Sequence, residues 1–156
     1  MSMHSATRRR RAVAAAVAVS AGLLVLSACD KPTPIATITV GTNSVDAEAT
    51  CYNDGAELNA AALAKCVGAK DIKSIKVDPD ASVHFGVDPE IAKNSWTILL
   101  NGQPLTDSST KTYRTIPGSV FFNAQYGAQG NSTTVSIKEG DKTVKGLWSF
   151  KLEKAA

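Results

Sequence analysis

The chain has few of the side chains on which most protein chemistry depends. Its 156 residues include two histidines, three cysteines and two methionines, and after residue 28 there is no methionine and one histidine, His84. Zinc and soft-metal sites need clusters of Cys, His or Met ligands, so we expect no metal in this part of the chain. A single imidazole also leaves nucleophilic catalysis only one possible histidine base.

The chain has no excess of positive charge once the amino end is set aside. Four of the 17 basic residues are consecutive arginines at 8–11, and the chain after residue 28 carries 13 basic and 14 acidic residues. No basic run and no mixed aromatic and basic pattern remains there, which argues against nucleic-acid binding. We therefore expect neither a nucleic-acid partner nor a bound cofactor.

The amino end has the layout of a secretory signal peptide. Residues 1–7 are polar, 8–11 are basic, and 12–26 are apolar except for Ser20. The apolar run is shorter than the roughly 20 residues that a membrane-spanning helix needs. An ordinary signal cleaved after Ala28 is the alternative, but it places bulky Leu26 where a small side chain belongs.

Leu26-Ser27-Ala28-Cys29 resembles the lipobox of bacterial lipoproteins, in which the cysteine becomes the lipid-modified first residue. We predict a lipoprotein signal peptide at 1–28 and, as in such lipoproteins, a diacylglycerol on Cys29. Its two acyl chains would hold the protein in a bilayer far better than one. Residues 29–34 then form a lipid-anchored tether. Its prolines favour an extended course of about 3.1 Å per residue, or roughly 20 Å to Ile35. The predicted location is the outer face of the cell membrane.

The other two cysteines, Cys51 and Cys66, are predicted to form a disulfide, because thiols outside the cell tend to oxidise. By loop-closure entropy, a bridge around a segment of this length contributes about 3 kcal/mol. The enclosed residues are rich in helix formers, and Asn53 or Asp54 can cap the amino end of a helix. We expect one short helix pinned by the bridge.

The rest of the chain has the pattern of short β-strands separated by turns. Acid-proline pairs, Asn101-Gly102, Pro117-Gly118 and Glu139-Gly140-Asp141 provide turn signals. The expected strands are residues 35–40, 72–77, 82–87, 95–100, 112–116, 118–122, 132–138 and 143–153.

This spacing predicts a mainly β fold with a single domain at 35–156, an immunoglobulin-like or fibronectin-like sandwich. The segment 96–102 is similar to the third strand and turn of such domains, and strands around Val135 and Trp148 are expected to form the closing hairpin. Both cysteines that remain for a disulfide precede Trp96, so this is not an antibody-type domain.

Several short segments, taken with the lipobox, carry a resemblance to a known family. They are CYNDG at 51–55, VDP at 77–79, FGVDPEIA at 85–92, NGQPL at 101–105, TYRTIPGS at 112–119, FFNAQ at 121–125 and GLWSFKL at 146–152. The chain resembles the actinobacterial, Streptomyces-type lipoproteins catalogued as domain of unknown function 2771, over nearly all of its length after residue 28. The resemblance implies an envelope location and supplies no activity.

Two acid-proline clusters suggest a calcium site. Asp78 and Asp80 precede the expected strand at 81–87, and Asp88 and Glu90 follow it. At about 3.3 Å per residue, the strand separates the clusters by roughly 23 Å, so they cannot share one ion. We interpret these residues as turns.

His84 lies within the same expected strand. Strand parity places it with Ser82 and Gly86, opposite the apolar residues at 83, 85 and 87. We therefore expect His84 to face solvent. No serine lies in a G-x-S-x-G motif that this histidine would serve.

The best candidate for a binding surface is the segment 118–132. If residues 118–122 form a strand whose Val120 and Phe122 face the core of the domain, Phe121 points outward. It then lies beside the amides Asn123 and Gln125 and the ring of Tyr126. Exposed aromatic rings beside amides suit sugar or peptide recognition. The alternative is that a neighbouring loop or helix covers Phe121.

The predicted function is a membrane-anchored, non-enzymatic binding or scaffolding module of the cell envelope, whose partner is an envelope protein or glycan. Two alternatives stay open. One is an envelope enzyme that uses carboxylates on a polymer substrate, since folding can bring two acids together. The other is an inhibitor or accessory protein of one envelope partner.

Overall fold

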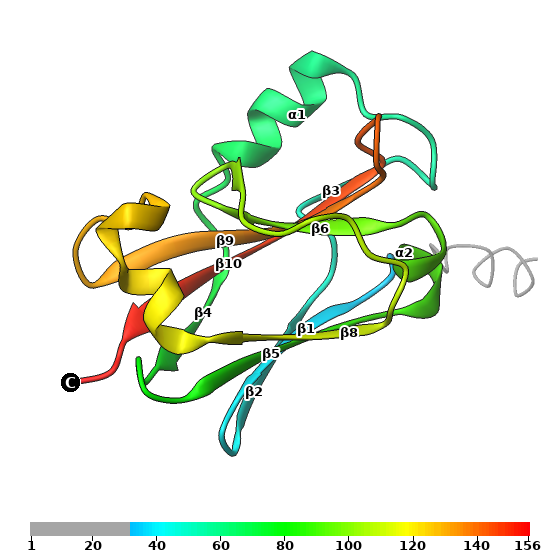
Figure 1. The fold of residues 1–156 in the computed structure, drawn as a ribbon. Helices are drawn as coiled ribbons and strands as arrows, with labels where there is room; N and C mark the ends of the chain where they lie inside the picture. Colours follow the sequence, from blue (N-terminus) through cyan, green and yellow to red (C-terminus); the bar gives the residue numbers. More distant parts are fainter. Residues whose placement is uncertain (1–31) are drawn as a thin grey trace, which may run out of the picture. The chain divides into compact units, whose positions relative to one another are not determined.

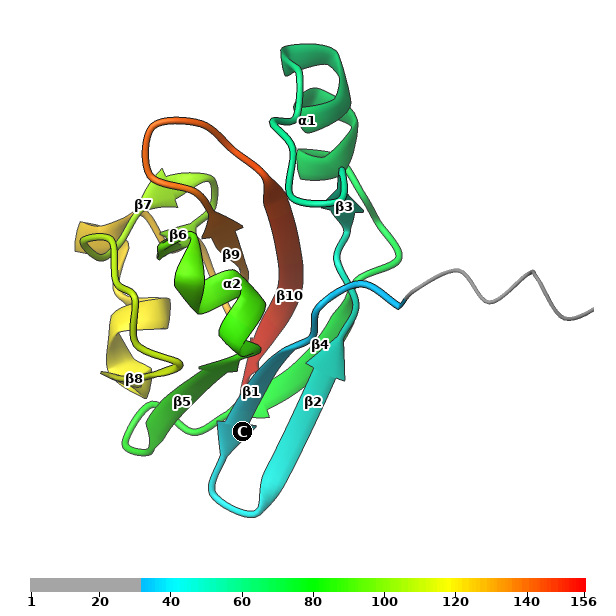
Figure 2. The same ribbon diagram turned by 90° about the vertical axis from the view of Figure 1, so that its right-hand side faces the viewer.

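The computed structural model describes residues 32–156, in which two β-sheets pack against each other (Figures 1 and 2). The predicted signal peptide, Cys29 and the first part of the tether lie outside the described residues. No helix within the described part is long and apolar enough to cross a membrane.

The first sheet has the strand order β2-β1-β5-β8 and is antiparallel throughout. The second has the order β3-β10-β9-β6-β7, and β4 runs parallel to β10 along the edge that β10 also shares with β3. The strands of the first sheet are β1 (Ala36–Val40), β2 (Asn43–Ala47), β5 (Ser82–Val87) and β8 (Tyr113–Pro117). Those of the second are β3 (Cys51–Tyr52), β4 (Lys73–Val77), β6 (Trp96–Leu100), β7 (Gln103–Pro104), β9 (Ser132–Glu139) and β10 (Gly146–Lys154).

The core lies between the sheets and follows from the alternation of apolar residues. Ile38 of β1 pairs with Phe85 of β5, and Ile137 of β9 pairs with Trp148 of β10, so each pair faces the interior. The predicted closing hairpin of the last two strands is confirmed. The largest fully buried side chains are Trp96, Trp148, Phe85, Phe121 and Phe150.

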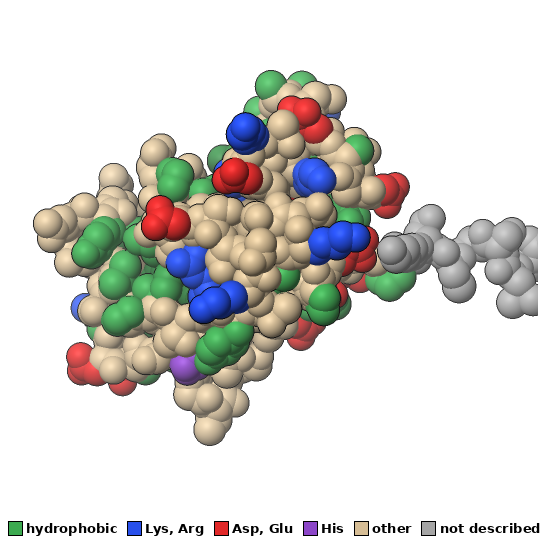
Figure 3. All heavy atoms as spheres, turned by 45° about the vertical axis from the view of Figure 1, so that its right-hand side comes forward, with side chains coloured by type: hydrophobic (Ala, Val, Ile, Leu, Met, Phe, Trp, Pro, Cys, Tyr) green, Lys and Arg blue, Asp and Glu red, His purple; other side chains and the backbone are tan. Residues whose placement is uncertain are grey.

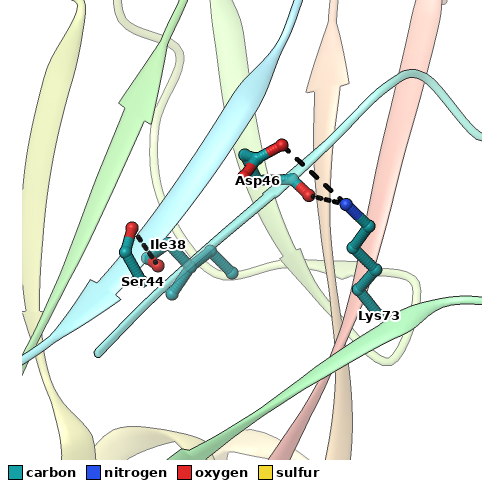
Figure 4. Close-up of polar contacts among 4 residues, drawn as sticks. All are labelled: Ile38, Ser44, Asp46 and Lys73. Atoms are coloured by element: carbon teal, nitrogen blue, oxygen red, sulfur yellow. Dashed lines mark hydrogen bonds and ion pairs between the residues drawn. The ribbon is translucent and has the colours of Figure 1, made fainter.

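One edge of the sandwich is closed by contacts between β2 and the strand β4 of the other sheet (Figure 4). The ammonium group of Lys73 donates to the carbonyl of Asp46 at 2.6 Å and lies 3.8 Å from its carboxylate. Within the first sheet, the Ser44 hydroxyl donates to the carbonyl of Ile38 at 3.4 Å. Both side chains of the Lys73–Asp46 pair are exposed, and exposed ion pairs contribute little to stability.

The helix between the cysteines begins later than expected. α1 (Ala60–Val67) is capped by Asn59, whose side-chain oxygen accepts from the backbone N–H of Ala62 at 2.8 Å. The expected caps, Asn53 and Asp54, are not used, because Asp54 and Gly55 adopt left-handed backbone angles of 46° and 79°. These angles form a turn and delay the helix.

Two other segments differ from the sequence prediction. Asp88-Pro89 is expected from the sequence to form a turn. It instead begins the short helix α2 (Pro89–Lys93), because proline fits the first turn of a helix. The expected strand at 118–122 is wrong: it is the 3₁₀ helix η1 (Gly118–Phe122), followed by η2 (Ala124–Tyr126).

Candidate functional site

The loop of residues 123–129, which we name the amide loop, is held in place by Asn101. The Asn101 side chain donates to the carbonyl of Gly127 at 3.0 Å and accepts from the backbone N–H of Thr134 at 3.1 Å. Asn101 itself has a φ of 48°, which asparagine tolerates better than most residues. The turn after β6 therefore fixes the amide loop against the start of β9.

The amide loop exposes polar groups and one aromatic ring. Asn123 and Gln125 are exposed, and the Asn123 side-chain oxygen accepts from the backbone N–H of Gln125 at 2.9 Å. Tyr126 is 50% exposed. A hollow of about 210 Å³ beside it is lined by Asn101, Gly127, Gln129 and Ser132. Three of the four predicted surface residues, Asn123, Gln125 and Tyr126, thus lie together on the surface.

The fourth predicted residue, Phe121, is not on the surface. Its side chain is 0% exposed, and its ring centroid lies 5.8 Å from that of Phe85 in the core. The prediction that Phe121 points outward is wrong because a 3₁₀ helix has three residues per turn, so strand parity does not apply. The helix is drawn inward at Gly118, where a Cβ atom would lie 2.5 Å from the carbonyl oxygen of Asp78.

His84 lies on the outer face of β5, as strand parity predicts, and is half-buried. Its Nδ1 atom hydrogen-bonds to the Thr115 hydroxyl at 3.0 Å and to the Tyr113 hydroxyl. The His84 and Tyr113 rings stack, with centroids 5.6 Å apart and planes 17° apart. Figure 3 shows a face of the molecule on which side chains of both charges are dispersed among hydrophobic ones. Tyr113 is 54% exposed, so this pair forms a second aromatic surface.

A buried carboxylic acid, Glu139, was missed by the sequence analysis. Its side chain is 0% exposed, and its Oε1 accepts from the Asn94 side chain at 2.6 Å. Lys145 in turn donates to the Asn94 side-chain oxygen at 3.2 Å. The Oε2 atom of Glu139 has no hydrogen-bond partner among the described residues. Burial raises the pKa of Glu139 despite the opposing effects of Asn94 and Lys145.

The position of Glu139 follows from the register of β9. Residues 133, 135 and 137 face inward, and Glu139 continues this series opposite Trp96 on one side and Gly146 on the other. A Cβ atom at Gly146 would lie 2.9 Å from Oε2 of Glu139 and 2.6 Å from the Trp148 ring, so only glycine fits. The strand alternation was the signal that could have revealed Glu139.

Tyr52 and Glu90 lie near this acid. The Tyr52 hydroxyl donates to the Glu90 carboxylate at 3.5 Å, and burial, with the charges of Glu139 and Glu90, raises the pKa of Tyr52. A polymer substrate cannot touch a side chain that solvent does not reach. The geometry therefore gives Glu139 no role as the acid of a carboxylate-dependent enzyme.

The acid-proline residues act locally at the two ends of β5. The Asp78 carboxylate accepts from the backbone N–H of Asp80 at 2.9 Å, and the Asp88 carboxylate accepts from that of Ile35 at 2.7 Å. Among residues 32–156, no three His, Cys, Asp or Glu side chains are grouped closely enough to hold a metal ion.

Cys51 and Cys66 are paired, as predicted. Their sulfur atoms lie at disulfide-bonding distance and their Cα atoms are 5.7 Å apart, which is in the usual range for a disulfide. The bridge links the edge strand β3 to α1.

Comparisons with protein-family models, with curated proteins and with solved structures find no match to this chain. The resemblance to domain of unknown function 2771 stays a prediction.

Proposed function

We propose that the protein is a lipid-anchored, non-enzymatic binding module at the extracytoplasmic face of the cell membrane. One observation carries this proposal: the indole N–H of buried Trp148 donates to the carbonyl of Pro34 at 2.7 Å. The chain is thus fixed to the folded body only five residues after the predicted lipid site, Cys29. A module held this closely to its anchor is suited to work next to the membrane.

The neighbours of Pro34 shorten the tether further. The Thr33 hydroxyl accepts from the backbone N–H of Ala49 at 3.0 Å, so the body begins at Thr33. At about 3.5 Å per residue, Cys29 to Thr33 spans at most roughly 14 Å. The proposed tether is therefore shorter than the roughly 20 Å that the sequence alone indicates.

The amide loop is the proposed contact surface for the partner. Figures 1 and 2 show η1 and η2 at the opposite end of the sandwich from the start of β1, where the tether enters. If the start of β1 faces the membrane, the amide loop faces away from it. Amide groups and a half-exposed tyrosine suit an envelope protein or glycan as partner.

We infer further that the sandwich is immunoglobulin-like. In such domains one sheet contains the first, second and fifth strands and the other contains the third, sixth and seventh. The sheet β1-β5-β8 and the sheet β10-β9-β6 follow this order, and Trp96 lies at the start of β6.

The anchor is tested with labelled fatty acid and the variant Cys29→Ser. We expect the variant to lose the lipid label and to keep residues 1–28, whereas the control Cys51→Ser with Cys66→Ser keeps the label. Unchanged labelling of Cys29→Ser would overturn the anchor.

The contact surface is tested by cross-linking in intact cells. We expect Tyr126→Ala to remove the cross-linked partner and the matched control Tyr113→Ala, which alters an equally exposed ring on the face of the first sheet, to retain it. Equal capture by both variants would remove the amide loop from the proposal. Polymer hydrolysis by the purified protein would instead favour the carboxylate enzyme.

A further inference from the structure

A second and larger hollow, of about 550 Å³, opens between β3 and α1. We name it the α1 pocket. Its volume falls within the range of about 300–1,000 Å³ that is typical of small-molecule sites. It lies at the root of the tether, since Thr33 is part of its lining.

The walls of the α1 pocket are held by the protein itself. The Thr50 hydroxyl accepts from the backbone N–H of Ser149 at 3.0 Å, which joins this wall to β10. Asn59 caps α1, and the disulfide fixes that helix to β3. Leu58, whose backbone N–H donates to the carbonyl of Val144, is buried at 8% exposure. A pocket with walls of this kind exists before a ligand arrives.

The lining of the α1 pocket contains no charged side chain. Its polar groups retain hydrogen-bonding capacity beyond the bonds already made. The Thr33 and Thr50 hydroxyls accept from backbone N–H groups and still have their own O–H donors, and Asn59 uses its oxygen and keeps its NH₂ group. Asn53 donates to the carbonyl of Glu57 and keeps its oxygen as an acceptor.

Apolar side chains form the remainder of the lining. Ala62 and Leu58 lie among these hydroxyls and amides. An acyl chain would leave the polar groups without partners, which costs free energy in a desolvated site. A ligand that presents both hydroxyl groups and C–H faces satisfies both kinds of wall.

The surroundings of the α1 pocket disfavour anions. Burial raises the pKa of Tyr52, which lines the pocket, and the nearby charges of Glu139, Glu90 and Asp54 raise it further. These acids repel phosphate, whether it is free or part of a lipid headgroup.

We propose that the α1 pocket binds a neutral saccharide of one or two rings. This deepens the proposed function by naming a ligand class, and the presentation of that sugar at the membrane surface rests on the proposed anchor. Binding itself does not depend on the anchor. The α1 pocket thus takes a ligand on the membrane side, whereas the amide loop contacts a partner on the far side.

The experiment uses the full lipidated protein in nanodiscs of uncharged lipid, titrated with N,N′-diacetylchitobiose and followed by calorimetry. The test variant is Ala62→Leu, which fills the pocket from α1. Its control is Ala61→Leu, the adjacent, exposed helix position that does not line the pocket. We expect saturable binding, weakened at least about tenfold by Ala62→Leu and changed less than about twofold by Ala61→Leu.

The folding of each variant is checked by measuring whether its disulfide has formed and at what temperature it unfolds. If Ala62→Leu fails to fold, Ala62→Met replaces it, because methionine adapts to irregular gaps. No saturable binding below about 10 mM N,N′-diacetylchitobiose, equal binding by Ala62→Leu and Ala61→Leu, or preferential binding of inorganic phosphate would each overturn the proposal. Because the anchor is judged by lipid labelling alone, the failure of either proposal is recognised separately.

Discussion

The β-sandwich and the segment of residues 51–67 reach their structures by different means. The sandwich buries two tryptophans and several phenylalanines between its sheets. The segment 51–67 buries only Leu58 and Cys66, leaves Val67 63% exposed, and is held by the disulfide. Because α1 has eight residues, fewer than the roughly 12–15 that give even marginal helices in water, it depends on its cross-link and cap. Burial stabilises one region and covalent restraint the other.

The largest expected effect tests the burial side of this comparison. Phe121→Ala should destabilise the protein by about 3–5 kcal/mol, because it empties a fully enclosed site beside Phe85. That is a large part of the about 5–15 kcal/mol available to a typical domain. Denaturant unfolding measures the loss. A change below about 0.5 kcal/mol, which is typical of surface positions, would mean that Phe121 is exposed and not part of the core.

The covalent side is tested by Cys51→Ala with Cys66→Ala. Loop-closure entropy gives a loss of about 3 kcal/mol for a loop of this length. Because the enclosed segment contributes little to the core, amide hydrogen exchange should accelerate mainly in α1 and less in β9 and β10. Equal acceleration in the sheets and α1 would show that the two regions unfold as one unit.

Glu139→Gln is expected to change how stability depends on pH. Burial raises the pKa of Glu139 above 4.5, so the folded protein holds this proton more tightly than the unfolded chain. The resulting contribution is fully present below pH 4.5 and is lost as pH rises through the folded pKa. Glutamine does not titrate, so the variant should lack this decline. Denaturant unfolding of both proteins from acid to neutral pH measures the difference, and identical slopes would contradict the prediction.

The smallest effect on stability is expected for Tyr126→Ala. Half of this side chain is exposed in the amide loop, so the free energy of unfolding should change by no more than about 0.5 kcal/mol. Together with Phe121→Ala, this variant separates the surface of the segment 118–132 from its buried part. A loss as large as that of Phe121→Ala would mean that Tyr126 also supports the core.

The β-strands with clear alternation were predictable from the sequence. β1, β5, β6, β9 and β10 each place their apolar side chains inward. The disulfide followed from assigning Cys29 to the lipobox, which leaves Cys51 and Cys66 to pair in an oxidising compartment. The segment 118–122 was not, because a short apolar run fits a strand or a 3₁₀ turn equally well. The tight approach of Gly118 to Asp78 decides between them, and it is a contact between residues far apart in sequence.

The candidate sites were predictable only in part. Tyr126, Asn123 and Gln125 lie in one short loop, so a local pattern was enough to find them. The α1 pocket combines Thr33, Thr50 and Asn59, which come together only after the tether root, an edge strand and a helix have packed. Glu139 was visible in the alternation of β9, but its burial depends on Asn94 and on the missing side chain at Gly146.

The hydrogen bond from Trp148 to Pro34 joins positions 114 residues apart. If the chain is exported amino end first, as the predicted signal peptide implies, Pro34 emerges long before its partner Trp148. A chain that stops short of β10 would carry the predicted lipid site but could not fix residues 32–35 to the folded body. If the proposed anchor is present, a rigid connection between it and the folded body requires the chain through β10, and truncated chains should remain loose at residues 32–35 and open to proteases.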